Sequence, residues 1–393
     1  MMDSFSFAAT PHIHFGAGQR ALLAGLLKTF GSKVLLITGE VSFDDSDLCV
    51  TLSQQLSSCL TLHRESLSHE PTPTWVDDVV MRYHAKGIDV VLAIGGGSAV
   101  DAGKAVAGLL PSGDSIIAYL EGVGQNKPFA GITIPLIAVP TTAGTGGENS
   151  KNAVISVVGK NGFKKSFRDV TLVPKHVILD PELTVSCPAH VTAACGMDAF
   201  TQLLESYVAK GASPMTDALA WSGLEAIQRG LLPAFNNGQD IEARAAMLYA
   251  SSLSGLTLAN AGLGSVHGLA SPLGAFFPIP HGIVCGALLY QATALNIKAM
   301  QHRQHNHPAL MKYARVGRLF AEDMSLDDEQ AQDALLTILQ TYSKHLSIPK
   351  FSTWGVEHGD IQRIIQHISG GSMSGNPILL HHDELTDLLK HVI

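Results

Sequence analysis

The stretch Ala93–Asp101, with the sequence AIGGGSAVD, decides the fold of this chain. It continues an apolar run that begins at Val90 and predicts a buried parallel strand. The residues that follow, Ala102–Ala107, predict a helix. Glycines at such a turn let backbone N–H groups approach an anion, and the start of a helix adds unpaired N–H donors. The stretch therefore favours a phosphate-binding turn over a glycine-rich turn that has no ligand.

Two polar residues of this turn have a predicted part in starting the helix. Ser98 is a natural N-cap, and Asp101 then falls at the third helical position. This spacing is typical of a capping box, with Asp in place of the usual Glu. We therefore expect the helix to begin directly after Ser98.

The composition is that of a compact, well-buried enzyme. The chain has 393 residues, of which 46% are hydrophobic and 15% are charged, and this length predicts two domains. Its net charge of −8 argues against a nucleic-acid partner. The apolar runs are short and interrupted, and no leader pattern opens the chain, so we expect neither a membrane span nor a secretory signal.

The cysteines are odd in number and have no CxxC spacing, which predicts reduced thiols in a cytoplasmic protein. They are Cys49, Cys59, Cys187, Cys195 and Cys285.

Strands and helices alternate over the first half of the chain, and only helices are expected after it. Such alternation predicts a parallel sheet covered on both faces, with ligands beyond the carboxyl ends of its strands. The expected strands are 5–15, 33–38, 62–65, 90–94, 133–139 and 177–181, with a hairpin of 153–158 and 163–167. The expected helices are 21–30, 47–60, 74–85, 102–107, 191–210, 214–229, 241–258, 267–275, 282–300, 308–322, 325–346 and 360–367. We therefore expect an α/β domain over residues 1–183 and an all-helical domain over 184–393.

The helical half carries a second group of polar residues. Asp198, Gln202 and Glu205 are spaced so that they share one face of the helix expected at 191–210. His267 and His281, each followed by Gly, lie on separate elements because prolines interrupt the segment between them. Two histidines and an aspartate from three elements can converge on a divalent cation. Spacing alone also allows the alternative that these histidines cap helices or pack in the core.

Several motifs in sequence order resemble those of the iron-containing (group III) alcohol dehydrogenases. They are GGGSAVD at 95–101, PTTAGT at 140–145, GMDA at 196–199, HGLA at 267–270, PHG at 280–282 and GNP at 375–377. The resemblance covers nearly the whole chain. It implies a dinucleotide-binding α/β domain followed by an all-α domain, the architecture shared with dehydroquinate synthases, and an active site in the cleft between them.

The resemblance also implies which residues hold the cofactor. Gly95 to Ser98 would hold its pyrophosphate, the threonines after the second strand end would line it, and Lys164 or Lys165 would reach the ribose. In the family, an Asp at the end of the first strand often favours NAD. Here Gly39 leaves room for a 2′-phosphate whereas Glu40 would repel one, so NAD is expected and NADP stays possible. The full cofactor set is Gly39, Glu40, Gly95, Gly96, Gly97, Ser98, Asp101, Thr141, Thr142, Thr145 and Lys164.

The metal site departs from the family pattern, which is one Asp and three His. Asp198, His267 and His281 match three ligands and are the expected catalytic residues, but Gln202 stands where the family usually has His. An amide oxygen is a weaker ligand for iron(II) or zinc than imidazole. The ion can therefore bind through Gln202, or through three ligands and water, or the site works without metal; we expect a bound iron or zinc. Ser271 stands where many members have a proton-relaying His.

The sequence thus predicts an NAD(P)-dependent, metal-assisted oxidoreductase that interconverts an alcohol and an aldehyde or ketone by hydride transfer. Maleylacetate reductases and glycerol dehydrogenases share the motifs, and a nucleotide-binding protein without catalysis is a further alternative. The segment 265–281 has no Arg or Lys, which counts against a dianionic substrate. We expect a small-molecule substrate, no nucleic-acid or membrane partner, and a homodimer that pairs through the strand at 5–15.

Overall fold

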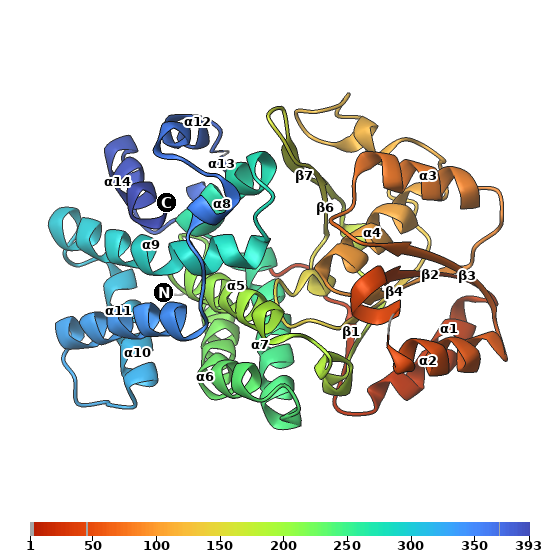
Figure 1. Cartoon of the computed structure of the whole chain (residues 1–393), viewed down its shortest axis with the longest axis horizontal. Helices are drawn as coiled ribbons and strands as arrows, with labels where there is room; N and C mark the ends of the chain where they lie inside the picture. Colours follow the sequence, from red (N-terminus) through yellow and green to blue (C-terminus); the bar gives the residue numbers. More distant parts are fainter. Residues whose placement is uncertain (1–3, 45, 369) are drawn as a thin grey trace.

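The computed structural model describes residues 4–44, 46–368 and 370–393. A parallel sheet with its helices forms one half of the molecule, and a group of packed helices forms the other (Figure 1). This confirms the predicted α/β and all-helical architecture. The last strand of the sheet ends at Leu179 and the first long helix of the other half begins at Ala189, so a domain boundary near Leu183 remains our proposal.

The six-stranded sheet has the order β1-β8-β5-β4-β2-β3, and all its neighbouring strands are parallel. Its strands are β1 (His12–Phe15), β2 (Lys33–Gly39), β3 (Thr61–Leu67), β4 (Val90–Gly95), β5 (Leu136–Pro140) and β8 (His176–Leu179). Every residue of β4 is buried, because this strand lies between β2 and β5 and is covered on both faces. The predicted strand over 5–15 is only partly correct. Pro11 precedes the first paired residue, and its lack of an N–H group is the physical reason.

Four helices cover the two faces of this sheet. Alternate side chains of β2 and β4 pack against α3 and α4 on one face and against α1 and α2 on the other. These helices are α1 (Leu23–Phe30), α2 (Asp47–Ser57), α3 (Pro73–Tyr83) and α4 (Gly97–Leu109). The short helices of this half are η1 (Gln19–Leu22), η2 (Glu40–Asp44), η3 (Ile116–Tyr119), η4 (Gly147–Asn149), η5 (Val170–Leu172) and η6 (Pro181–Thr184). The predicted hairpin is present as β6 (Asn152–Val157) and β7 (Phe163–Arg168), which are antiparallel.

The predicted capping box at the start of α4 is wrong. The helix begins at Gly97 rather than after Ser98, and its N-cap is Gly96, which has no side chain to cap with. Because the turn consists of three glycines, the backbone can adopt helical angles already at Gly97, before the serine that was expected to cap the helix. The Asp101 carboxylate instead accepts a hydrogen bond from the backbone N–H of Val154, on the neighbouring hairpin.

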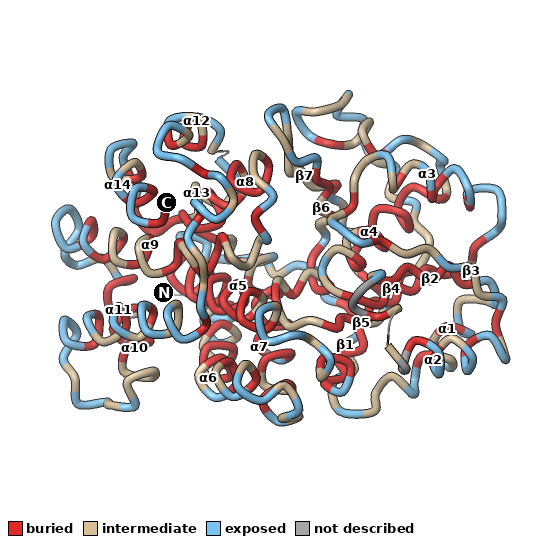
Figure 2. Tube along the Cα trace, viewed as in Figure 1, coloured by how far each residue is buried: buried red, intermediate tan, exposed pale blue. Residues whose placement is uncertain are grey.

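The other half is all-helical, and its buried residues form one large core that runs through α5, α7 and α9 (Figure 2). Its helices are α5 (Ala189–Val208), α6 (Pro214–Asn236), α7 (Ile241–Ala261), α8 (Ser265–Phe276), α9 (His281–Arg303), α10 (Pro308–Ala321), α11 (Asp328–His345), α12 (Ile361–Gln366), α13 (Gly370–Ser374) and α14 (His382–Val392), with η7 (Phe351–Trp354) and η8 (His358–Asp360). The first eight were predicted, whereas α13 and α14 were not. By length and composition α9 alone among the described helices resembles a membrane span, but 61% of its apolar window is buried inside the fold.

The two halves are joined where η4 and the loop before it pack against α7. The hydroxyls of Ser251 and Ser254 both donate to the carbonyl of Gly144, at 3.1 and 3.3 Å. Gly146 has φ +60°, and a Cβ atom on Gly255 would lie 1.9 Å from its carbonyl oxygen. Only glycine therefore allows the two backbones to approach so closely.

We expect Gly255→Ala to lower the free energy of unfolding by about 1–3 kcal/mol, since the added methyl group forces the two backbones apart. Urea unfolding followed by circular dichroism measures this. The matched control is Gly25→Ala on α1, where a Cβ atom would meet nothing within 4 Å. That control should be neutral or slightly stabilising. Equal midpoints for the two variants would contradict the close approach.

Candidate functional site

A cleft of about 2060 Å³ lies between the two halves and is lined by residues of both. The predicted site residues that line it are Gly97, Ser98, Asp101, Thr142, Thr145, Lys164, Lys165, Asp198, Gln202, His267, Ser271 and His281. The remaining ones, which do not line it, are Gly39, Glu40, Gly95, Gly96 and Thr141. The structure thus brings the glycine turn and the Asp/His group to one cavity.

On the α/β side, two strand ends face each other across the glycine turn. Gly95 has φ +153°, and a Cβ atom there would lie 2.8 Å from the Cβ atom of Ala99 and 3.1 Å from the backbone N of Gly39. The hydroxyl oxygens of Thr142 and Thr145 lie 3.5 Å from the positions that Cβ atoms would take on Gly96 and Gly97, respectively. The turn therefore places backbone without side chains next to two threonine hydroxyls and the start of a helix. This arrangement suits the binding of a phosphate group.

Two ionisable side chains on α4 lie next to this turn: Lys104 is buried, and Asp101 lines the cleft. The Lys104 ammonium is fully buried and donates to the backbone carbonyls of Gly147 and Asn152 and to the Ser150 hydroxyl. Burial raises the pKa of Asp101 to about 7, although the nearby Lys104 opposes that rise. Asp101 therefore lines the cleft as a carboxyl group that changes charge near neutral pH.

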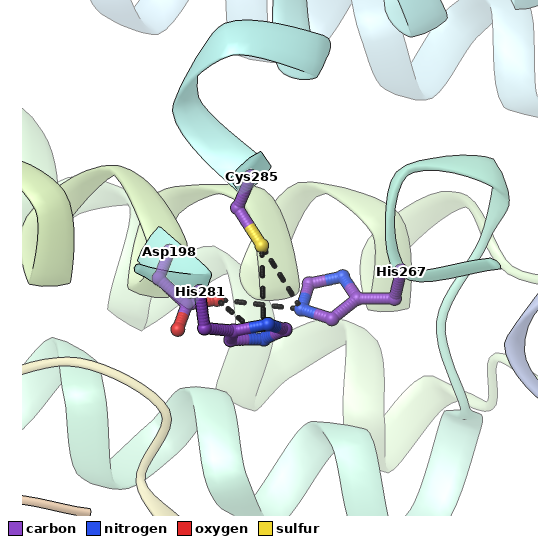
Figure 3. A group of neighbouring side chains, drawn as sticks. All are labelled: Asp198, His267, His281 and Cys285. Carbon is purple, nitrogen blue, oxygen red and sulfur yellow. Dashed lines mark hydrogen bonds and ion pairs between the residues drawn. The ribbon is translucent and has the colours of Figure 1, made fainter. Parts of the chain in front are cut away.

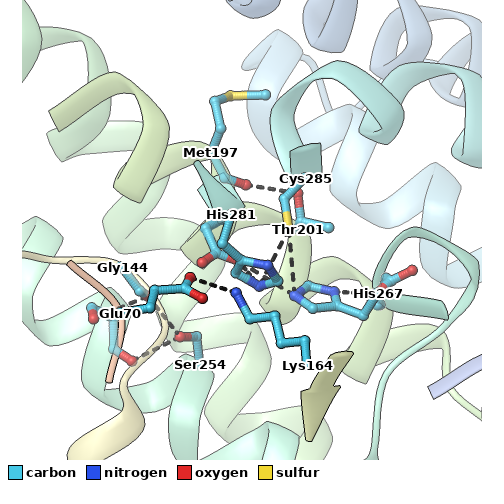
Figure 4. A network of polar contacts seen from close by, with 12 residues as sticks. Glu70, Gly144, Lys164, Met197, Thr201, Ser254, His267, His281 and Cys285 are labelled. Carbon is cyan, nitrogen blue, oxygen red and sulfur yellow. Dashed lines mark hydrogen bonds and ion pairs between the residues drawn. The ribbon is translucent and has the colours of Figure 1, made fainter. Parts of the chain in front are cut away.

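A lysine predicted to reach the cofactor is held by a carboxylate on the same, α/β side of the cleft. Lys164, on β7, forms an ion pair with Glu70, which also accepts a hydrogen bond from Ser156 (Figure 4). Burial would raise the pKa of Glu70, but the Lys164 ammonium and the hydrogen bonds lower it below its ordinary value. Glu70 is therefore a carboxylate at neutral pH and keeps the lysine pointing into the cleft.

On the helical side, the side chains of Asp198, His267 and His281 converge from α5, α8 and α9 (Figure 3). The Asp198 carboxylate lies 3.3 Å from Nε2 of His267 and 3.8 Å from Nε2 of His281. Cys285 joins them: its Sγ lies 3.6 Å from Nε2 of His267 and 3.8 Å from Nε2 of His281. The four ligand atoms all lie within 4.8 Å of one another. A buried carboxylate, two imidazoles and a thiol at these separations fit one divalent ion.

The charges within this group depend on one another. Burial disfavours a charged His267, yet Cys285, Asp198 and Glu205 together raise its pKa well above the ordinary value. Burial lowers the pKa of His281 to about 4, so this ring is neutral and presents a lone pair. Burial also opposes ionisation of Asp198, but the two histidines lower its pKa. The group therefore contains a carboxylate and at least one neutral imidazole at neutral pH, which are the forms that bind metal.

Residues around the group fix the position of His267. The Glu205 carboxylate accepts hydrogen bonds from Nδ1 of His267 and from the backbone N–H of Val266, both at 2.7 Å. Asn376 accepts from the backbone N–H of Ser265 at 3.1 Å and so holds the first turn of α8. A carboxylate behind a histidine fixes its tautomer and raises its basicity as a ligand. The face shared by Asp198, Gln202 and Glu205 thus supplies both a candidate ligand and the group that orients another.

Comparison with known proteins identifies the family. The model of iron-containing alcohol dehydrogenases matches residues 10–181, and the C-terminal model of the same family matches residues 192–393. The chain belongs to the iron-containing alcohol dehydrogenases. As a member of this family it is an oxidoreductase that interconverts an alcohol and an aldehyde or ketone, with NAD(P) and a divalent metal.

Relatives in this alcohol dehydrogenase family cover the whole chain. A NAD-dependent methanol dehydrogenase of Bacillus methanolicus is 30% identical over 99% of this chain and 100% of its own. A crystal structure of a 1,3-propanediol oxidoreductase has a TM-score of 0.87 at 26% identity and covers both chains fully. The NAD⁺ complex of sulfoacetaldehyde reductase from Bifidobacterium kashiwanohense has a TM-score of 0.85 at 26% identity over 99% of each chain.

Two features of this alcohol dehydrogenase escaped the sequence analysis. Cys285 was assigned only as a reduced thiol, although its position one turn after His281 on the same helix could have indicated a shared face. The Glu70 contact with Lys164 joins residues 94 positions apart and has no local signal.

Gln202 lines the cleft as expected, and its Oε1 is buried without a hydrogen-bond partner. Ser271 also lines the cleft, one turn after His267.

Proposed function

We propose that this chain is a NAD-dependent, metal-dependent dehydrogenase of small uncharged alcohols and their aldehydes. The observation that carries the proposal is that a phosphate-binding glycine turn and a buried Asp/His/His group line the same cleft. Glu40 does not line the cleft, but it follows Gly39, whose backbone N lies 3.1 Å from the Cβ position of Gly95 in the glycine turn. We take this position to support NAD, because a carboxylate there would repel the 2′-phosphate of NADP. Among the described residues that line the cleft, the helical half supplies no Lys or Arg, which favours an uncharged substrate over a dicarboxylate.

In this proposal the chain's residues divide the work between cofactor, metal and substrate. Gly97, Ser98 and the Thr142 and Thr145 hydroxyls, which all line the cleft, hold the cofactor phosphates, and Lys164 reaches the ribose. Asp198, His267 and His281 hold the ion, and Glu205 orients His267. A bound divalent ion polarises the substrate oxygen and lowers the pKa of the alcohol.

The rest of the cleft positions the substrate and carries the proton. Its helical wall includes large apolar side chains that exclude water from the substrate carbon, among them Phe277, Ile279, Ile283 and Trp354. Ser271 cannot take up and release a proton near neutral pH as a histidine can. We therefore assign the proton transfer to water in the cleft, with Ser271 as a hydrogen-bonding partner on its path.

A substrate panel tests the proposal. The purified protein is stripped with a chelator, reloaded with zinc or iron(II), and assayed with primary alcohols, aldehydes, glycerol and maleylacetate, each with NAD(H) and NADP(H). We expect activity that needs added metal, a lower KM for NAD than for NADP, and no preference for maleylacetate. Nucleotide binding without turnover under all these conditions would contradict the proposal and favour a protein that has lost catalysis.

The charge of Asp101 makes cofactor affinity depend on pH. Burial raises the pKa of this carboxyl to about 7, so it is mainly neutral at pH 6 and mainly anionic at pH 8. An anionic carboxylate beside the cofactor's pyrophosphate repels it. We expect the Kd for NADH to rise several-fold between pH 6 and 8, and Asp101→Asn to remove most of that rise. Fluorescence titration of NADH measures both, and an unchanged pH dependence in the variant would contradict the assignment.

We also propose that the enzyme is a cytoplasmic homodimer paired along β1. This strand is at the edge of the sheet, and Ile13 and Phe15 on it are 36% and 43% exposed. An edge strand with exposed apolar residues can add a strand from a second copy. Cytoplasmic location is supported by the five free cysteines. Light scattering should give a dimer for the native chain and a monomer for Ile13→Pro, because proline has no backbone N–H group to bond to a second copy's strand. If the variant is also a dimer, this pairing is contradicted.

A further inference from the structure

We infer that Cys285 is a ligand of the metal ion, and that its thiolate supplies the fourth protein ligand that Gln202 would otherwise have to provide. This inference rests on the proposed metal at Asp198, His267 and His281. It adds a soft sulfur ligand to that group and thereby favours zinc over iron(II).

The distances fit a shared ion. In a tetrahedral zinc site, bond lengths of about 2.3 Å to sulfur and about 2.0–2.1 Å to nitrogen or oxygen place sulfur about 3.6 Å from nitrogen, and oxygen about 3.4 Å from nitrogen. The Cys285 sulfur lies 3.6 and 3.8 Å from the Nε2 atoms of the two histidines. Oδ1 of Asp198 lies 3.3 and 3.8 Å from the same two atoms. These four separations are close to the edges of a coordination tetrahedron, and the other two are at most 4.8 Å.

The fold holds the sulfur in this position. Cys285 lies four residues after His281 on α9, so both side chains leave the same face of that helix. The residue is fully buried and is absent from the lining of the cleft, whereas Asp198, His267 and His281 line it. Figure 3 shows the sulfur directed at the two rings from the α9 side. The thiolate would thus approach the ion from the protein interior and leave the cleft side open for the substrate oxygen.

Ligand charge favours Cys285 over Gln202 as the fourth protein ligand. A thiolate and a carboxylate together neutralise a divalent ion, whereas an amide adds no charge and is a weak ligand for zinc. As the metal–sulfur bond forms, the thiol loses its proton to the buffer. Gln202 itself lines the cleft, but its Oε1 atom is buried and has no hydrogen-bond partner.

Cobalt(II) spectroscopy of the full chain tests the assignment. After removal of bound metal and loading with cobalt(II), we expect a sulfur-to-cobalt charge-transfer band in the near ultraviolet. Cys285→Ser should keep the visible cobalt bands and lose that band. The matched control is Cys195→Ser, because this thiol lines the same cleft but lies outside the ligand group, and it should keep the band. A wild-type protein that binds cobalt without the band, or a Cys285→Ser protein that keeps it, would overturn the inference.

Two measurements make the test independent of enzyme activity and of the folding of the variant. X-ray absorption at the zinc edge of the wild-type protein should show one sulfur neighbour at about 2.3 Å; a first shell of nitrogen and oxygen only would overturn the assignment. Competition with a chelator should show that Cys285→Ser holds zinc on the order of 100-fold less tightly, since even loss of an outer-shell partner costs 10–100-fold. Zinc bound without sulfur would end the Cys285 assignment alone, whereas failure to bind any divalent metal would end the proposed function.

Discussion

The His267→Ala variant is expected to lose on the order of 10³-fold or more in kcat/KM for alcohol oxidation, together with most of its bound metal. The His267 ring contacts three groups at once: Asp198, Glu205 and Cys285. Its removal takes a nitrogen ligand from the ion and leaves Asp198 and Glu205 without the ring that lies between them. The readouts are steady-state kinetics with NAD and metal content by elemental analysis.

The matched control is His190→Ala, because His190 lines the same cleft but lies outside the ligand group. It should retain metal and turnover. Circular dichroism of both variants separates a lost ligand from a lost fold, since Glu205 keeps its bond from the Val266 N–H group in the His267 variant. Retention of full turnover and metal by a folded His267→Ala protein would refute a metal-binding role for this residue.

The sequence predicted the features that depend on neighbouring residues. The apolar run before Gly95 and the three glycines were enough for β4 and its turn, because strand burial and glycine turns are local properties. The alternation of strands and helices was enough for the parallel sheet, and the helical pattern for the other half. The short α14 was missed, although its buried residues Leu385, Leu388, Leu389 and Val392 recur at helical spacing.

The sequence could not predict how distant segments meet. Cys285, Asp198 and His267 come together only because α5, α8 and α9 pack around one core. The start of α4 was misplaced by a local rule, because a serine favours an N-cap in general, whereas here the glycine turn itself fixes the helix start. Contacts across the fold therefore decided the extra candidate ligand, whereas the helix start was missed because one local rule overrode another.

Lys104→Met is expected to lower the free energy of unfolding by about 3–5 kcal/mol, the cost of breaking a buried charged network. The methionine fills a similar volume but leaves the carbonyls of Gly147 and Asn152 and the Ser150 hydroxyl without their donor. Burial lowers the pKa of Lys104, while Asp101 raises it, so the ammonium depends on this carboxyl. Urea unfolding measures the loss, with the exposed Lys28→Met as a control within about 0.5 kcal/mol of the native chain.

The same ammonium ties α4, which follows the glycine turn, to η4 and β6. The Lys104→Met variant that remains folded at low temperature should therefore also bind NADH more weakly, because the Thr142–Gly147 loop loses its attachment to that helix. Unchanged stability would show that the acceptors find other donors. Lower stability with unchanged NADH affinity would show that the loop is held by its contacts with α7 instead, through Ser251 and Ser254. The two readouts thus separate the role of Lys104 in the fold from its role in shaping the cofactor site.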